Sequence, residues 1–137
     1  MAFDLLIVKN PSRSGVDFAK ATGTAFAKGA IVARDLATGK YVPATSTTVR
    51  SDIFGFTDEA VTAGDTRLNV HGFEVFENDV FTATTTNNSN AAHNTQRMKL
   101  TNSTNVNNTG TDDADGVVYQ VDVIGAPADK KILVKFV

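Results

Sequence analysis

The feature that most constrains the fold is a series of short apolar runs, separated by turn residues, between positions 28 and 64. Residues 30–34 and 41–42 are β-type runs on either side of residues 35–39, whose final glycine suits the left-handed position of a short hairpin loop. Gly55 lies between aromatic residues in a third run, which indicates a bulge or a close approach of two backbones. Such a bend lets a small sheet curl, so we expect a small β-barrel.

Further strand patterns lie beyond this stretch. Pro43 has no backbone N–H to donate, so the second run ends there or lies at the edge of a sheet. Leu68 and Val70 alternate with polar residues, which is the period of a half-buried strand. Residues 117–124 and 131–137 predict two closing strands. Because sustained helical periodicity is absent, we predict an all-β chain.

Residues 82–111 have a different composition from the rest of the chain. Threonine and asparagine make up more than half of this segment, and apolar side chains are sparse. Burial within such a segment does not offset the entropy lost on ordering it, and structureless loops of this length are usually functional. We therefore expect a long polar flap here, with residues 96–100 as its one short strand.

The length of the chain favours one domain with additions. A chain of 137 residues can bury one core but is too short for two independent ones. An apolar run at residues 3–8 is followed by a turn-rich stretch, so we expect an N-terminal arm and linker over residues 1–24. Residues 25–137 then form the barrel domain, with the polar insertion at 82–111. We expect the nine phenylalanines to form core, except Phe3, which lies on the arm.

The overall composition excludes several classes of partner. A formal net charge of −2 provides no broad cationic surface for nucleic acid. The absence of cysteine removes disulfides, thiol nucleophiles and thiolate metal sites. The apolar run near the N-terminus is far shorter than a secretory core or a membrane span, so we expect no membrane partner.

Residues that could carry catalysis are few and scattered. His71 and His93 lie in different contexts, and the spacing of His71 from Glu74 and Glu77 does not align their side chains on one strand. No Gly-x-Ser-x-Gly motif is present, and Asp58-Glu59 is typical of a solvated face. We expect no enzyme activity, catalytic residue, metal, cofactor or small-molecule substrate.

The acidic segment 112–116 is the closest match to a metal motif. Asp113, Asp115 and Gly116 match the third, fifth and sixth places of a calcium loop, and Asp122 matches the twelfth. Thr111 replaces the first aspartate of that loop, and no helix flanks it. We interpret the segment as an acidic loop that enters a strand, with calcium binding as the alternative. Three Asn-x-Ser/Thr sequons, at Asn87, Asn102 and Asn107, follow from the Thr/Asn-rich composition.

Six short segments occur in an order that matches a known family. They are Gly29-Ala30-Ile31-Val32, Thr38-Gly39-Lys40, Val42-Pro43-Ala44, Ile53-Phe54-Gly55-Phe56, Ala63-Gly64-Asp65 and Val70-His71-Gly72. Together they cover under half of the chain, and in order and spacing they resemble the small head-decoration, or cement, proteins of tailed bacteriophages. The polar segment 82–111 departs from the compact members of that family.

This resemblance implies a β-tulip or SH3-like barrel that binds the outside of an assembled capsid and stabilises it. The implied partner is the major capsid protein, the implied oligomer is a homotrimer, and the implied location is the virion surface after synthesis in the host cytoplasm. In that family an N-terminal arm often becomes ordered on docking, and an apolar strand can add to another sheet. We therefore expect capsid-binding residues in the arm, namely Phe3, Leu5, Ile7 and Arg13.

Two other functions stay open. One is a receptor- or glycan-binding β-module of a virion, in which the flap over residues 82–111 makes the contacts. The other is a tail-tube or head-completion component, which is also structural. An enzyme is the last alternative, because it needs a clustered carboxylate pair in a concave site.

Overall fold

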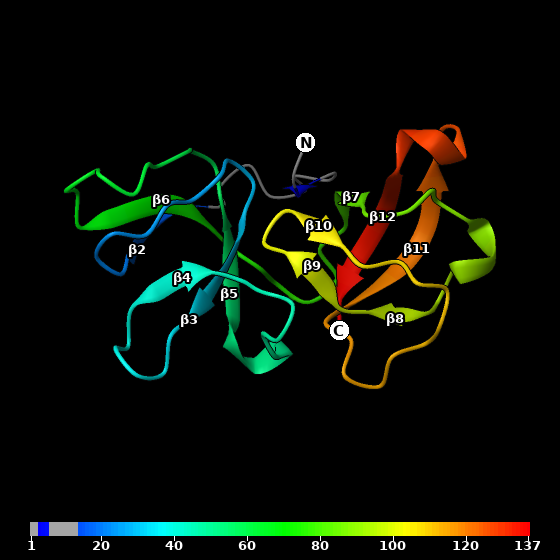
Figure 1. Cartoon of the computed structure of the whole chain (residues 1–137), viewed down its shortest axis with the longest axis horizontal. Coiled ribbons are helices and arrows are strands. Elements are labelled where there is room, and N and C mark those ends of the chain that lie inside the picture. The colour runs from blue at the N-terminus through cyan, green and yellow to red at the C-terminus, as the bar shows by residue number, and fades with distance from the viewer. Residues whose placement is uncertain (1–2, 6–13) are drawn as a thin grey trace.

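The computed structural model describes residues 3–5 and 14–137, which form an all-β fold of two sheets lying side by side (Figure 1). The five-stranded sheet has the order β2 (Val16–Ala19), β6 (Asn69–Glu74), β5 (Ile53–Thr57), β3 (Ile31–Arg34) and β4 (Tyr41–Pro43). The seven-stranded sheet has the order β8 (Arg97–Met98), β11 (Val118–Ile124), β12 (Lys131–Phe136), β7 (Phe81–Thr85), β10 (Asn105–Val106) and β9 (Leu100–Asn102), and β1 (Asp4–Leu5) also pairs with β7. Three 3-10 turns complete the described elements: η1 (Arg50–Asp52), η2 (Ala91–His93) and η3 (Pro127–Asp129).

Both sheets curl until their edges approach each other. In the five-stranded sheet, Lys20, just after β2, forms a parallel bridge with Tyr41 of β4, and the Ala21 N–H donates to the Tyr41 carbonyl at 3.0 Å. In the seven-stranded sheet, the edge strands β8 and β9 are consecutive in the chain, with Lys99 alone between them. The all-β, barrel-like prediction is confirmed, and the sequence did not predict that there are two such sheets.

Local signals placed the first hairpin and its bend correctly. Strands β3 and β4 are joined by the predicted turn, in which Gly39 has φ 71° and the Asp35 N–H donates to the Lys40 carbonyl at 2.8 Å. The register between β3 and β5 shifts at Gly55, and a Cβ atom there would collide with the backbone carbonyl of Phe73. The predicted close approach is therefore confirmed. Pro43 lies in β4, an edge strand, also as predicted.

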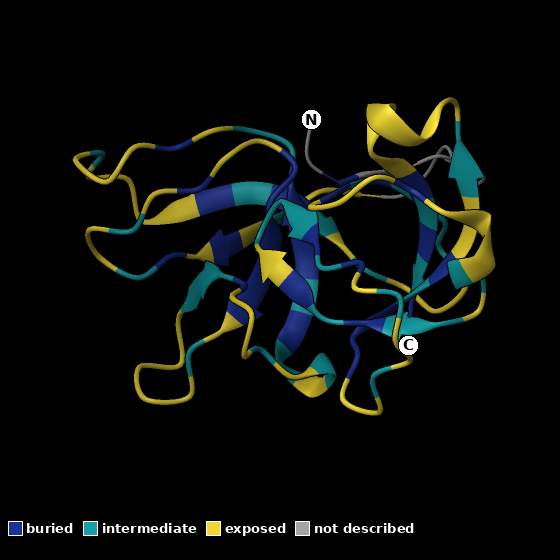
Figure 2. Ribbon diagram, turned by 45° about the vertical axis from the view of Figure 1, so that its right-hand side comes forward, coloured by how far each residue is buried: buried dark blue, intermediate teal, exposed yellow. Residues whose placement is uncertain are grey.

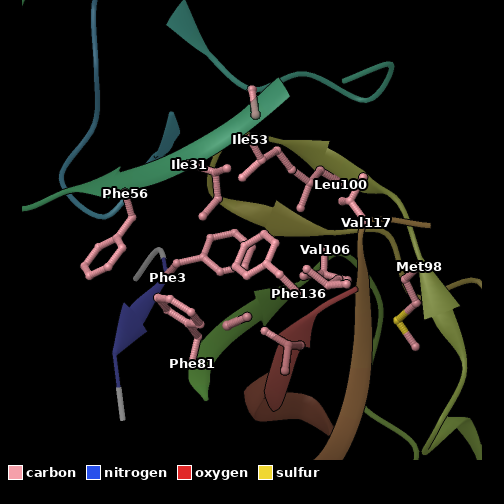
Figure 3. Packing of buried hydrophobic residues seen from close by; sticks show 14 of the residues in the cluster. Phe3, Ile31, Ile53, Phe56, Phe81, Met98, Leu100, Val106, Val117 and Phe136 are labelled. Atoms are coloured by element: carbon pink, nitrogen blue, oxygen red, sulfur yellow. The ribbon is translucent and has the colours of Figure 1, made fainter. Parts of the chain in front are cut away.

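The main core lies where the two sheets face each other (Figures 2 and 3). The ring of Phe56 in β5 packs edge-on against Phe81 of β7 at 5.2 Å, and Phe81 packs against Phe136 of β12 at 5.4 Å. A smaller core inside the five-stranded sheet includes Phe18, Phe26 and other apolar side chains. Because the main core takes side chains from both sheets, the sheets pack as one body.

The N-terminal residues that the structure describes belong to the fold. Phe3 is 2% exposed, its ring lies 5.9 Å from that of Phe136, and its N–H donates to the Gly29 carbonyl at 3.1 Å. The expectation that Phe3 lies outside the core is wrong, because the strand that follows it pairs with β7 and carries the ring between the sheets. Residues 16–19, which we expected in a linker, form β2 and pair with β6.

The segment 82–111 is part of the second sheet, so the prediction of a polar flap is wrong. It contains most of β7 and all of β8, β9 and β10. Its amide side chains replace missing backbone partners: Asn108 Oδ1 accepts from the Asn87 N–H at 2.9 Å, and its Nδ2 donates to the Asn87 and Asn88 carbonyls, both at 3.1 Å. Long-range pairing and these side-chain bonds order a segment that its average composition predicted to be a loop.

Candidate functional site

A surface hollow of about 620 Å³ lies where the two sheets meet. Its walls come from separate parts of the chain: residues 46–51 between β4 and β5, Lys99 between β8 and β9, residues 114–116 before β11, and Val137. We call this set of residues the junction hollow. It combines hydroxyl groups, two cationic side chains and two exposed valines.

Arg50 is the fixed cation of the junction hollow. Its Nε donates to the backbone oxygen of Val137, the last residue of the chain, at 2.7 Å, and its Nη1 donates to the Ile53 carbonyl at 3.2 Å. Its guanidinium lies 5.7 Å from the centre of the Phe136 ring. Partial burial lowers the pKa of Arg50, but an arginine in a protein stays charged at any physiological pH. The guanidinium is therefore held in place as a positive charge where the sheets join.

The rest of the hollow is more exposed. The Lys99 side chain is 43% exposed, and its Nζ lies 3.9 Å from Asp113 Oδ2, a loose ion pair. Val49 and Val137 are each 52% exposed. An exposed cation thus lines the same hollow as a fixed one, together with two exposed valines.

A second group of charged residues surrounds His71 on β6. His71 Nδ1 lies 2.8 Å from both carboxylate oxygens of Asp58, and the His71 N–H donates to Glu59 Oε1 at 3.0 Å. The bond to Asp58 raises the pKa of His71. The bond from the His71 N–H, and after it the contact with the Arg67 guanidinium at 3.0 Å, lower the pKa of Glu59. The Arg67 backbone N–H and guanidinium, each at 2.9 Å, lower the pKa of Asp65.

This arrangement holds the loop between β5 and β6 against the sheet. An Asp–His pair can act as a general base when it faces a substrate in a concave site. Here the side chains of His71 and Asp58 are 43% and 36% exposed, and Gly15 packs against the other side of the imidazole. We interpret the His71 cluster as structural.

The acidic segment 112–116, for which calcium binding was the alternative interpretation, is held by an arginine and by its own backbone. Asp112 Oδ2 accepts from Arg97 Nη2 at 2.7 Å, and the same arginine lowers the pKa of Asp112 to about 2. Asp113 accepts from the Asp115 N–H at 2.9 Å, a bond within the loop. Within residues 3–5 and 14–137, no three histidine or carboxylate side chains gather in a way that could hold a metal ion.

The four residues expected to bind a capsid are not brought together on a described surface. Phe3 is buried between the sheets, and Leu5 lies in β1, where it pairs with Phe81. Ile7 and Arg13 lie outside the described residues. Sequence reasoning missed the junction hollow entirely, because its walls are far apart in the chain and no local pattern links them.

Two further observations concern the whole chain. In the part of the chain that the structure describes, every helix is too short to cross a membrane. No known protein-family model, no curated protein and no solved structure matches the sequence or the fold.

Proposed function

We propose that this chain is a non-enzymatic structural protein that binds the outer surface of an assembled virus shell and stabilises it. One observation carries the proposal: the segments that resemble head-decoration proteins lie together in the five-stranded sheet. They supply residues of β3, β4, β5 and β6 and the corner before β6.

The architecture suits a role in binding rather than in catalysis. Two curled sheets with a shared aromatic core form a rigid body, and the junction hollow presents a mixed polar and apolar surface. A virus shell repeats one docking site many times, so a modest contact at each site stabilises the whole assembly. The proposal includes contact with the major capsid protein and, as the resemblance implies, a homotrimer on the virion surface.

The glycan-binding alternative depended on a free flap over residues 82–111. These residues instead contribute four strands to the second sheet, so no specific feature of the fold favours that alternative over shell binding.

A direct binding experiment tests the proposal. The mass of the purified chain in solution gives its oligomeric state, and the chain is then mixed with bare shells and imaged by electron microscopy. We expect added density at regular positions on the shell and a higher temperature of shell disassembly. Shells that stay bare at saturating protein concentration would refute the proposal.

The role of the N-terminal arm needs point substitutions rather than a deletion, because removal of Phe3 and Leu5 would also remove a core side chain and a strand. The variants Ile7→Ser and Arg13→Gln leave those residues intact. We expect weaker shell binding. Full binding by the double variant would exclude both residues from the interface.

A further inference from the structure

The side chain of Gln120 in β11 is a buried amide of which only one half is paired. Gln120 is fully buried, and its Nε2 donates to the Asn90 carbonyl and to Asn94 Oδ1, both at 2.8 Å. Its Oε1 is also buried and has no hydrogen-bond partner among the described residues. The orientation of the amide is fixed, because a turn by 180° would place Oε1 against the Asn90 carbonyl, which is itself an acceptor. Gln120 therefore presents a buried oxygen that needs a donor.

Two more unpaired polar atoms belong to the segment that packs on Gln120. They are His93 Nδ1 and Gln96 Oε1, both buried and both without a hydrogen-bond partner in the part of the chain that the structure describes. Backbone bonds hold this segment to β11: the Thr95 N–H donates to the Gln120 carbonyl at 2.8 Å, and the Gln120 N–H donates to the Gln96 carbonyl at 3.2 Å. The segment also folds back on itself, since the Gln96 N–H donates to the His93 carbonyl at 3.0 Å. The three unpaired atoms thus belong to one contact, between residues 90–96 and β11.

The chemistry of these three atoms selects the ligand. Both amide oxygens accept hydrogen bonds, whereas Nδ1 of a neutral imidazole donates or accepts, depending on its tautomer. Three neutral groups would leave the charge of a metal ion uncompensated, and an apolar molecule would leave all three atoms unpaired. A water molecule donates two bonds, and a buried water typically bonds to about three polar groups that lack protein partners. One water that donates to the two amides and accepts from the imidazole pairs every one of these atoms.

We propose that a single water molecule is bound between η2 and β11 as part of the fold. It donates to Gln96 Oε1 and Gln120 Oε1, and it accepts from the Nδ1–H of His93. The neutral His93 ring therefore carries its proton on Nδ1, while Nε2, the nitrogen beside Gly110, has none. The water joins the segment to β11 through side chains, in addition to the backbone bonds, and this link does not depend on what the chain binds.

Long-range proton–nitrogen NMR of the whole chain identifies the protonated nitrogen of His93 in mildly alkaline solution, where an imidazole is neutral. We expect the proton on Nδ1, with a cross-peak from this proton to a long-lived water. His71 is the internal control, because its Nδ1 faces the Asp58 carboxylate and should show no long-lived water. A His93 ring that is protonated on Nε2 alone, or an Nδ1–H without a bound water, overturns the proposal.

The variant Gln96→Met tests the link to β11, because it removes one of the two amide oxygens and keeps the length of the side chain. We expect backbone hydrogen exchange at Thr95 and Gln120 to become about five-fold faster, as the loss of one ordinary hydrogen bond predicts. Asn88→Ala is the control, because Asn88 is an exposed amide before the segment, and exchange should change by less than about two-fold. Equal exchange in the wild type and in Gln96→Met would show that no water links Gln96 to β11.

A crystal structure that resolves ordered waters gives the direct test. We expect one water within hydrogen-bond distance of His93 Nδ1, Gln96 Oε1 and Gln120 Oε1. A Gln96 amide turned by 180°, with its Nε2 donating directly to Gln120 Oε1 and no water between the two side chains, would refute the site.

Discussion

The burial of Phe3 leads to a quantitative prediction for the variant Phe3→Ala. The side chain is 2% exposed and packs against Phe136 at the junction of the sheets. Replacing a buried phenylalanine by alanine typically costs about 3–5 kcal/mol, from lost transfer free energy and the cavity left behind. Strand β1 has only two residues, and among the described residues it pairs only with β7, with one further backbone bond from Phe3 to Gly29; we therefore expect residues 3–5 to shift and let the neighbouring side chains close in. We therefore expect a loss near the lower end, about 3 kcal/mol.

The assay is equilibrium unfolding in urea, with Phe76→Ala as the matched control. Phe76 is 47% exposed, so its truncation should cost about 1 kcal/mol or less. With a slope of about 1–3 kcal/mol/M for a small protein, the midpoint of Phe3→Ala should fall by roughly 1–3 M urea. If the two variants lose the same stability with the same slope, Phe3 does not join the sheets, and the reasoning is wrong.

Two further predictions concern the first sheet. Gly55→Ala should lower the free energy of unfolding in urea by about 1–3 kcal/mol, because the new methyl group meets the Phe73 carbonyl. Gly64→Ala is the control: the space around Gly64 is open, so stability should change by less than about 0.5 kcal/mol. Equal effects of the two substitutions would contradict the close approach at Gly55. The bond to Asp58 raises the pKa of His71. The stabilisation that this pair gives the folded state is therefore complete at pH values below the ordinary histidine pKa of 6.5, and it disappears as the pH rises through the raised pKa. The thermal midpoint of the His71→Gln variant should lack this pH dependence. If the wild type and the variant show the same pH profile between 6 and 9, the pair contributes nothing to stability.

The parts of the fold that the sequence predicted correctly are those with local causes. Gly39 is needed at a positive φ, Gly55 allows two backbones to approach, and Pro43 cannot donate to a central ladder. Each of these constraints is expressed by the type of a single residue, so a single sequence reveals it, although the backbone that Gly55 approaches, at Phe73, is distant in the chain. The alternation that included Leu68 did not hold, because that residue precedes β6 and is 80% exposed.

The second sheet and the junction hollow have no such local signal. Strand β10 has two residues and pairs in parallel with β7, about twenty positions earlier in the chain, and β8 is equally short. A two-residue strand shows no periodicity, since a period of two needs several repeats to be recognised. The walls of the hollow likewise meet only because both sheets fold, so no spacing rule could have brought Arg50 and Lys99 together.

The segment 82–111 shows why average composition was misleading. The segment contains few apolar residues. Four of them are nevertheless 2% exposed or less, namely Ala83, Met98, Leu100 and Val106. Each enters a core whose other walls come from β11, β12 and the first sheet, so the segment does not need to supply its own apolar partners. The entropy argument for a flap assumed burial within the segment alone, whereas the free energy of ordering it depends on burial against the whole protein. A polar segment with a few well-placed apolar residues can therefore be as ordered as a hydrophobic strand, provided that its amides are paired as those of Asn108 are.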